Sequence, residues 1–403
     1  MQDIWILDGA RTPMTEWSGG KTGAGARGGA LKDVSAIELG AHAVRAALSR
    51  AGVDPAQVEH VVMGNALQTS GDAIYGARHV ALKAGVPIES PALTVNRLCG
   101  SGLQSVVSAA QMMQLGEASV TVAGGMENLS QTPHVMRGAR EGYRLGQTAA
   151  LEDLLMVALH DPMCGCYMAG TAENLARQME ITREEQDDFA LESMTRSIAA
   201  TKHGRFKEEI EPIEVQRGRK TVLVEHDDHM QAEPTREGLA ALPTAFGKDG
   251  FVTAGNASGI VDGAAALVLA TESTAREMGR KGMAHVKNWA YVGVEPEIMG
   301  IGPAPAIRAL LEKTGLGLDD IGLFEINEAF AAQYLAVEKD LDLDRSRVNV
   351  NGGAIGLGHP LGATGSRLLY TLALEMKKRE VRYGIASACI GGGQGMAVLL
   401  ESV

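Results

Sequence analysis

The chain has 403 residues, of which 50 are glycine and only 4% are aromatic, and its formal net charge is −12. The ordinary apolar content excludes a disordered chain, the lack of a Gly-X-Y repeat excludes collagen, and the acidic balance argues against nucleic acid as a partner. The glycine excess must therefore serve tight turns, close packing, or backbone that approaches a ligand.

The cysteines and the N-terminus narrow the class further. The four cysteines are Cys99, Cys164, Cys166 and Cys389, and none forms a Cys-x-x-Cys pair. This pattern argues against a disulfide framework and against a zinc ribbon, so we expect no bound metal. Asp3 stands where a secretory signal carries positive charge, and no apolar run approaches the ~18–20 residues of a membrane span. We therefore expect a cytoplasmic protein with no membrane span.

Strand-like and helical segments alternate along the chain, as in α/β proteins. A helix is expected over residues 35–51, because Ser35 begins a Ser-x-x-Glu capping box and Gly52 follows the last turn. A second capping box at Thr182 predicts another helix in the middle of the chain. The remaining expected segments are a strand over 60–65, a strand-turn-helix over 94–113, a strand over 118–125, and a later series over 323–337, 348–353, 366–376 and 383–393.

The early and late series resemble each other in the same order, about 260 residues apart. This order predicts a duplicated α/β unit. We expect one core half from residues 1–120 together with 251–275, and the other from 276–403. Residues 121–250, which are more charged and mixed in pattern, are expected to form an inserted loop domain between the halves.

Cys99 lies in the segment VNRLCGSG, at an expected strand-to-helix turn. The positive end of a helix dipole lowers the pKa of a thiol, and Gly100 and Gly102 leave the approach to it open. Cys99 is therefore a candidate nucleophile. The alternative is a small buried residue in a turn, since free cysteines are often buried.

His359 lies in GLGHPLGATG, at the place in the late series that corresponds to Cys99. Pro360 favours an extended backbone at His359, while Gly358 and Gly362 remove bulk on both sides. We interpret His359 as an exposed general base; the alternative is a histidine in a surface turn.

Two further turns carry candidate functional groups. Cys389 begins CIGGGQG, whose successive amides could form an anion-binding nest, and no GxGxxG fingerprint supports dinucleotide binding there. Asn327 in INEAFAAQ is either a helix N-cap or a side chain that orients a water or substrate. The turns at Cys99, Asn327, His359 and Cys389 all follow expected strands, where α/β proteins bind ligands.

The segments VNRLCGSGLQ, AGNASGIVDGAAA, INEAFAAQ, NGGAIGLGHPLGATGSR and CIGGGQG together resemble the thiolase family, from ILDGARTP to the C-terminus. The resemblance implies the thiolase fold, two duplicated αβαβα halves that form a layered core with an inserted loop domain. It also implies an acyl-transferase that joins or thiolytically cleaves 3-ketoacyl-CoA.

The resemblance assigns a role to each candidate. Cys99 would be the nucleophile and His359 the base that accepts its proton. Cys389 would be the second thiol, acting as acid and base at the α-carbon, since Cys99 is acylated when that proton moves. Asn327 would hold a water that forms one oxyanion hole with His359. The backbone amides of Cys99 and Gly391 would form the other.

The resemblance also places CoA contacts, with acyl-CoA and CoA as substrates rather than cofactors. The corresponding residues are Ser258, Met168, Phe246 and Ala254. The chain departs from the biosynthetic acetoacetyl-CoA enzymes at Gln231, Gly238 and Tyr167, where a basic residue, serine and histidine are expected. These departures leave the nucleotide contacts and the preferred acyl chain open. The stretch HDPMCGCYMAGTAENLA resembles the degradative, broader-chain members more closely, so we expect a degradative, broad-chain enzyme rather than a biosynthetic one. Cys164 and Cys166 are expected to be structural or incidental.

Three other functions fit the sequence less well. A ketoacyl-synthase-type condensing enzyme would lack the second cysteine that Cys389 provides. A catalytically inactive CoA-binding relative is disfavoured because all four candidate side chains are present, and an NAD-dependent dehydrogenase lacks its fingerprint. A homodimer or homotetramer is expected, with residues 126–147 as the candidate association loop.

Overall fold

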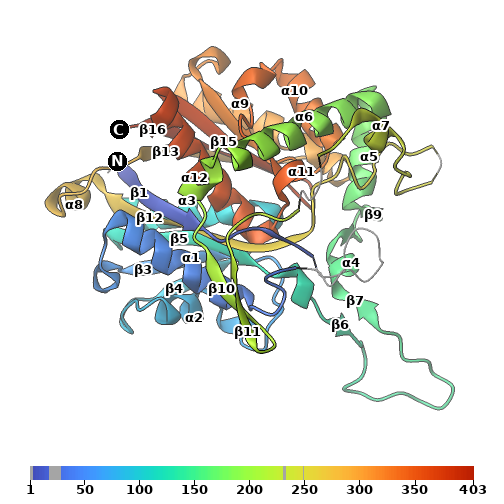
Figure 1. Cartoon of the computed structure of the whole chain (residues 1–403), viewed down its shortest axis with the longest axis horizontal. Helices are drawn as coiled ribbons and strands as arrows, with labels where there is room; N and C mark the ends of the chain where they lie inside the picture. Colours follow the sequence, from blue (N-terminus) through green and yellow to red (C-terminus); the bar gives the residue numbers. More distant parts are fainter. Residues whose placement is uncertain (1–2, 18–28, 230–232, 248) are drawn as a thin grey trace.

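The computed structural model describes residues 3–17, 29–229, 233–247 and 249–403, and its centre is a ten-stranded mixed sheet (Figure 1). The order along the sheet is β14 (Leu323–Ile326), β15 (Tyr383–Ile390), β16 (Gln394–Ser402), β13 (Ala284–Gly293), β1 (Ile4–Arg11), β12 (Val261–Thr271), β5 (Val120–Glu127), β3 (His60–Gly64) and β4 (Ala92–Val95). The short strand β2 (Thr15–Glu16) pairs with β12.

The two ends of this sheet have the same topology. In the first half, β3 is parallel to β4 and β5, while β12 is antiparallel to both β5 and β1. In the second half, β14 is parallel to β15 and to a bridge at Val348, while β16 is antiparallel to both β15 and β13. β1 and β13 join the halves through the pairs Trp5–His285 and Ile6–Ala284. The predicted duplication is confirmed.

Helices form three layers around the two half-sheets (Figure 1). α1 and α2 cover the first half, α9 and α10 cover the second, and α3 packs against α12 in the central layer. The bounds are α1 (Ala36–Ala51), α2 (Gly76–Lys83), α3 (Ser101–Gln114), α8 (Glu272–Glu277), α9 (Pro303–Thr314), α10 (Ala331–Leu341), α11 (Ala354–Leu357) and α12 (Leu361–Arg379).

The ends of α1 follow from its sequence. The Ser35 side chain accepts a hydrogen bond from the backbone N–H of Glu38, and Gly52 ends the helix with φ 61°. Such an N-cap contributes about 1 kcal/mol, and glycine adopts the left-handed region at little cost. The helix expected over residues 35–51 is confirmed.

Glycines let the two central helices approach closely. A Cβ on Gly365 of α12 would lie 2.2 Å from the backbone N of Leu103, and a Cβ on Gly102 of α3 would lie 2.5 Å from that of Ser366. These contacts leave no room for side chains. Part of the glycine excess therefore serves the crossing of α3 and α12, the helices that follow Cys99 and His359.

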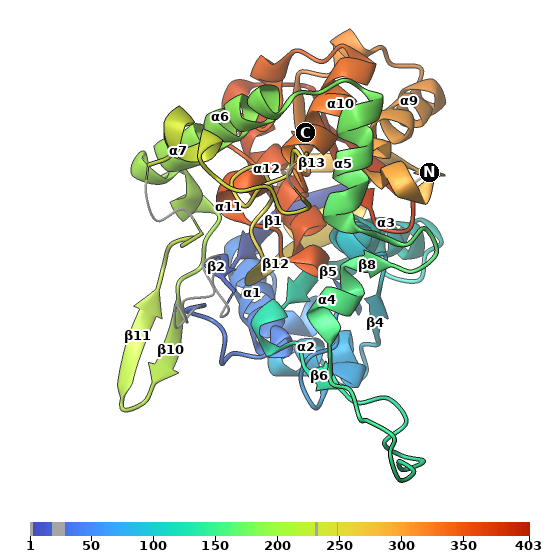
Figure 2. The ribbon, with the colours of Figure 1, turned by 90° about the vertical axis from the view of Figure 1, so that its right-hand side faces the viewer.

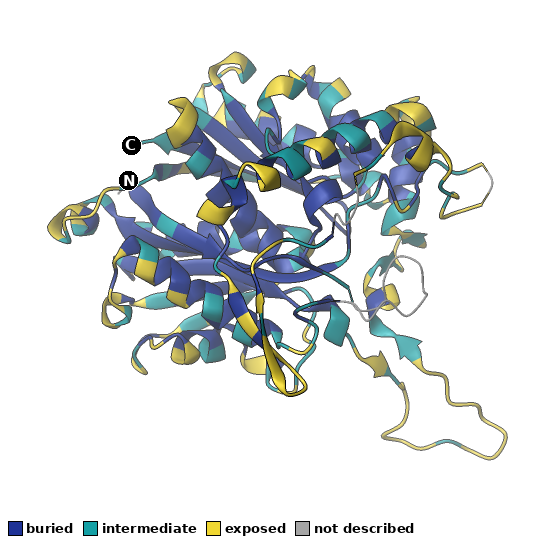
Figure 3. Cartoon of the chain, viewed as in Figure 1, coloured by how far each residue is buried: buried dark blue, intermediate teal, exposed yellow. Residues whose placement is uncertain are grey.

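The insertion between β5 and β12 packs mainly on the second half. Its helices α5 and α6 share a hydrophobic core with α9 and α10, while the stretch around β6 and β7 projects from the molecule and is largely exposed (Figures 2 and 3). Its elements are β6 (His134–Val135), β7 (Glu152–Asp153), α4 (Leu154–Ala158), β8 (His160–Asp161), β9 (Cys166–Tyr167), α5 (Met168–Gln178), α6 (Arg183–Lys202), β10 (Ile213–Arg217), β11 (Lys220–Val224) and α7 (Arg236–Ala240).

The core extends further than expected at the start of this insertion. β5 remains fully buried as far as Glu127, paired with β3 up to Gly125 and with β12 up to Glu127, so residues 121–127 belong to the sheet. The chain therefore leaves the core after Glu127 rather than at residue 121. The α6 capping box is present as predicted, because Thr182 and Glu185 hydrogen-bond to each other's backbone N–H.

Candidate active site

An apolar cavity of about 230 Å³ brings together residues from both halves and from the insertion. Cys99 comes from the first half and His359 from the second, while Met168 and Phe246 come from the insertion. Ser258 lies between them, in the loop before β12. Enclosed apolar clefts with few polar groups are typical of small-molecule sites.

Cys99 lies in a single 3-10 turn over Leu98–Gly100, directly before α3. The preceding residue, Leu98, has φ 47°, a strained value for a side chain that is not glycine. The backbone N–H groups of Gly391 and of Cys99 itself lie close enough to the thiol sulfur to favour the thiolate.

The pKa of the Cys99 thiol is raised, contrary to the expectation from the helix dipole. Burial raises it to about 11, and the two N–H donors offset only part of this effect. The reason is that the free-energy cost of removing the thiolate from water exceeds the stabilisation that the helix end and the two amides provide. Cys99 is thus a neutral thiol at rest and needs a base.

His359 lies two positions before the start of α12 and is only 6% exposed, so the expectation of an exposed side chain is wrong. Its Nδ1 is 2.6 Å from Oγ1 of Thr364, and that hydroxyl donates its hydrogen to the carbonyl of Pro360 at 3.1 Å. The hydroxyl has another acceptor in the Pro360 carbonyl, and the Asn327 amide nitrogen that faces Nε2 can only donate. Both contacts favour the tautomer with the imidazole hydrogen on Nδ1. Nε2 is then the unprotonated nitrogen, and it lies 3.3 Å from Nδ2 of Asn327.

The His359 imidazole is neutral at physiological pH. Burial, followed by the positive charge of Arg367, lowers its pKa to about 3. A neutral imidazole whose tautomer is held by a hydroxyl can accept a proton at Nε2. The geometry therefore matches the predicted base.

Asn327 follows β14 and is held from both sides. Its backbone N–H donates to the carbonyl of Ser387 at 2.9 Å. The next residue, Glu328, accepts hydrogen bonds from Ser193 at 2.6 Å and from Asn349 at 2.8 Å. Within the described residues, Oδ1 of Asn327 is buried without a protein partner, which leaves an acceptor for the water that was predicted there.

Cys389 is fully buried near the end of β15 and packs against Met299 and Ala329. Burial and the neighbouring Cys99 sulfur raise the pKa of its thiol well above the usual range. The two predicted thiols are therefore close enough to interact electrostatically. A thiol with a raised pKa forms a strongly basic thiolate when it loses its proton.

The glycine turn after Cys389 connects β15 to β16. Gly392 and Gly393 have φ 78° and 80°, which favour glycine, and a Cβ on Gly391 would press on Met168 and Leu98 at 3.2 and 3.3 Å. The absence of side chains keeps the Gly391 amide against the Cys99 sulfur. This is the arrangement expected of a backbone oxyanion hole.

The residues expected to contact CoA divide into two groups. Ser258, Met168 and Phe246 line the cavity, and Phe246 is 42% exposed at its surface. Ala254 is exposed but is not part of the lining. The cavity wall also includes Tyr167, where the chain departs from the expected histidine.

Gly238, Cys164 and Cys166 do not line this cavity. Gly238 is exposed in α7, where its N–H donates to Thr235, and Gln231 lies outside the described residues. Cys164 and Cys166 are free, partly exposed thiols around the turn between β8 and β9.

Sequence reasoning missed three residues that hold the site. Thr364 lies five positions after His359 and orients its ring. The sequence does contain a signal for it, because a hydroxyl side chain one turn into the helix that follows His-Pro can reach back to the histidine. Glu127, an acid at the end of an apolar strand, accepts the N–H of Gly362 in the first turn of α12 at 2.9 Å. Arg97 carries no local signal, because its partner Gln394 is 297 positions away.

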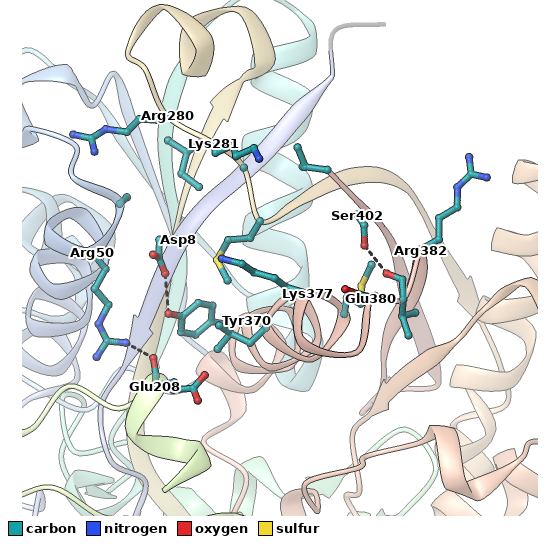
Figure 4. Close-up of a pocket in the computed structure, with 18 of the residues that line it drawn as sticks. Asp8, Arg50, Glu208, Arg280, Lys281, Tyr370, Lys377, Glu380, Arg382 and Ser402 are labelled. Carbon is teal, nitrogen blue, oxygen red and sulfur yellow. Dashed lines mark hydrogen bonds between the residues drawn. The ribbon is translucent and has the colours of Figure 1, made fainter.

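A larger cavity of about 800 Å³ lies at the opposite end of α12 and lacks the reacting groups (Figure 4). There Tyr370 donates to Asp8 at 2.9 Å, and Arg50 donates to the carbonyl of Glu208 at 2.7 Å. The described residues that line it include no cysteine or histidine. Its size alone therefore does not make it the reaction site.

Two features are absent from the described part of the chain. No helix there is long and apolar enough to cross a membrane. No group of three or more histidine, cysteine or acidic side chains in these ranges is placed to hold a metal ion.

Comparisons with known proteins agree over the full chain. Residues 6–273 match the family described as thiolase, N-terminal domain, and residues 280–402 match thiolase, C-terminal domain. The mitochondrial 3-ketoacyl-CoA thiolase of Homo sapiens is 49% identical over 404 residues, covering 100% of this chain and 99% of the relative. The acetyl-CoA acetyltransferase of Cupriavidus necator is 46% identical over 402 residues, covering 100% of each chain.

Solved structures show the same likeness. The crystal structure of human mitochondrial 3-ketoacyl-CoA thiolase has a TM-score of 0.95 at 48% identity and covers 100% of this chain and 99% of that one. A structure of the same human protein in complex with CoA has a TM-score of 0.94 at 48% identity, with coverage of 100% and 98%.

Proposed function

This chain belongs to the thiolase family, and we propose that it is a degradative 3-ketoacyl-CoA thiolase with a broad chain-length range. It would cleave 3-ketoacyl-CoA with CoA through an acyl-cysteine at Cys99. The reverse direction of the same reaction is a Claisen condensation. The observation that carries the proposal is an apolar cavity lined by Cys99 and a neutral His359, with the buried Cys389 thiol close enough to Cys99 to interact with it.

The first half-reaction breaks the carbon–carbon bond. His359 Nε2 accepts the proton of Cys99, and the thiolate attacks the 3-keto carbon. The resulting oxyanion is stabilised by the backbone amides of Cys99 and Gly391. The bond between C2 and C3 then breaks, which leaves the acyl group on Cys99, and Cys389 donates its proton to C2 of the departing acetyl-CoA enolate.

The second half-reaction restores the enzyme. The thiol of CoA attacks the acyl-Cys99 thioester and gives its proton to the Cys389 thiolate. The Cys99 sulfur leaves and recovers its own proton from His359. The products are acetyl-CoA and an acyl-CoA shortened by two carbons, and both thiols return to their resting state.

Labelling of the wild-type enzyme tests this assignment. Incubation with acetyl-CoA, followed by digestion and mass spectrometry, should find an acetyl group on the peptide that contains Cys99. An adduct confined to Cys164 or Cys166 would contradict it. Cys99→Ser should remove the adduct, because an alcohol is far less acidic than a thiol.

The degradative preference rests on the apolar character of the cavity and on a relative named as a 3-ketoacyl-CoA thiolase. Leu67, Leu129, Leu155 and Leu361 line the walls around Cys99, where an acyl chain longer than acetyl would find contacts. The alternative, a biosynthetic acetoacetyl-CoA thiolase, is favoured by the acetyltransferase relative. Thiolysis rates across 3-ketoacyl-CoA substrates of increasing length decide between them. A sharp preference for acetoacetyl-CoA would support the alternative.

A homodimer or homotetramer and a cytoplasmic location complete the proposal. The exposed projection within residues 126–147 supports association, as do the exposed apolar side chains Ile74, Ile88 and Leu93 at and beside the edge strand β4. Analytical ultracentrifugation of Leu93→Lys should show a smaller species than the wild type. Fractionation of the source cells tests the location, since the human relative is named as mitochondrial.

A further inference from the structure

Arg97 connects the turn that carries Cys99 to the turn that carries Gly391. Its Nε donates to the side-chain oxygen of Gln104 in α3 at 2.8 Å, which fixes the guanidinium relative to the first half. Its Nη1 donates to the side-chain oxygen of Gln394 at 2.8 Å. Gln394 is the first residue of β16, directly after the glycine turn.

Further contacts hold this arginine in one orientation. The backbone N–H of Arg97 donates to Oγ of Ser101 at 2.8 Å, and Ser101 donates to the carbonyl of Leu98 at 2.7 Å. The guanidinium carbon lies 5.1 Å from the ring centre of Tyr291, on the strand β13 that pairs with β16. The side chain is thus anchored in both halves of the core.

The distance that this link controls matters for the chemistry. One amide of the oxyanion hole belongs to Cys99 and the other to Gly391, and they lie on different halves. A backbone hole works only when both donors already lie where the oxyanion forms, about 2.7–3.1 Å away. The strained φ of Leu98 and the side-chain-free turn at Gly392 and Gly393 both leave the donors in need of outside support.

We infer that Arg97 is a positioning residue that sets the spacing of the Cys99 and Gly391 amides and thereby the acyl-transfer oxyanion hole. The inference rests on the proposed function for the roles of those two amides. Arg97 forms no ion pair with a carboxylate in the described part of the chain, and both of its side-chain bonds go to amide oxygens. The bonds are therefore directional, and a point charge does not replace them.

The test compares Arg97→Met and Arg97→Lys with the wild-type full chain. Rapid-quench mass spectrometry measures the rate at which acetyl-CoA acetylates Cys99. We expect Arg97→Met to be slower by about 10–100-fold in this step, with KM for acetyl-CoA within about threefold of wild type. Arg97→Lys should remain slower than wild type by about tenfold or more. Lysine keeps the charge but lacks the planar guanidinium that donates to Gln104 and Gln394 at the same time.

Gln394→Met removes the other end of the same link. It should slow acetylation by a similar factor, and the Arg97→Met/Gln394→Met double variant should be no slower than the worse single variant. Arg50→Met is the matched control, because Arg50 is also half-buried and joins two segments, but at the far end of α12 (Figure 4). It should change the acetylation rate by less than about twofold.

Three results would overturn the inference: wild-type acetylation in Arg97→Met, a loss no larger than that of Arg50→Met, or additive losses in the double variant. If Arg97→Met does not fold, as judged by circular dichroism, Arg97→Lys and Gln394→Met carry the comparison. A wild-type enzyme that never acetylates Cys99 would instead refute the proposed function, so the two failures are distinguishable.

Discussion

Replacing Thr364 with valine tests whether the tautomer of His359 controls the reaction. Valine keeps the shape of threonine but removes the oxygen that accepts the Nδ1 hydrogen at 2.6 Å. His359 and Thr364 are both buried, so the ring hydrogen would lose its partner without access to water. An unsatisfied buried donor costs about 1–3 kcal/mol, and this cost falls on the tautomer that leaves Nε2 free.

That free energy translates into rate. With 1.4 kcal/mol per factor of ten, the active tautomer loses about 5- to 150-fold in population relative to the form protonated at Nε2. We therefore expect acetylation of Cys99 by acetyl-CoA to slow by about 10–100-fold in Thr364→Val. Thr364→Ser keeps the hydroxyl and is the matched control, with an expected loss below about threefold.

The assay is rapid-quench mass spectrometry of the Cys99 peptide at pH 7, with thermal unfolding measured on the same samples. Equal acetylation rates in Thr364→Val and Thr364→Ser would refute the reasoning, since the hydroxyl would then not select the tautomer. A loss in Thr364→Val that follows only from a lower fraction of folded protein would refute it as well.

Three further predictions follow from the same geometry. Cys389→Ala should still acetylate Cys99 but should fail to exchange the α-protons of acetyl-CoA with deuterated water; undiminished exchange, followed by NMR, would assign the base to another residue. Alkylation of resting Cys99 by iodoacetamide should rise about tenfold per pH unit between pH 7 and 9, because its pKa of about 11 leaves little thiolate below that range; a plateau near pH 7 would contradict this. Gly365→Ala places a Cβ 2.2 Å from the backbone of Leu103 and should lower the free energy of unfolding by at least about 1–3 kcal/mol. Gly71→Ala, which meets nothing within 4 Å, should be near neutral by urea unfolding.

The order of elements in the core was predictable because it depends on local patterns. The segments 60–65 and 323–326 each carry an apolar strand, and both become strands with parallel neighbours in the sheet. The same order of strand and helix segments occurs twice in the sequence, and this repetition alone predicts the duplication. The expected end of the first half at residue 120 is wrong, because it cuts through the strand that the apolar pattern itself predicts over 118–125, and β5 continues to Glu127.

The positions of the candidate reacting residues were also predictable. Cys99, His359 and Cys389 lie in or beside glycine-rich turns, and Asn327 directly follows a strand. Their electrostatic states were not. A helix end suggested a lowered pKa for Cys99, and a Gly-His-Pro turn suggested an exposed His359. Burial decided both, because it depends on how tightly α3 and α12 pack on the half-sheets.

The sequence by itself thus determined the kind of fold, the duplication, and the candidate reacting side chains, because these depend on the periods and motifs of neighbouring residues. Only the tertiary structure decided how the site is held. Arg97 bonds to Gln394 across 297 positions, and Glu127 bonds to Gly362 across 235. Such pairs leave no local pattern, since they exist only when two distant segments are packed side by side. The glycine excess illustrates both. The sequence shows the number of glycines, but only the packed helices show that some of them let α3 and α12 cross closely.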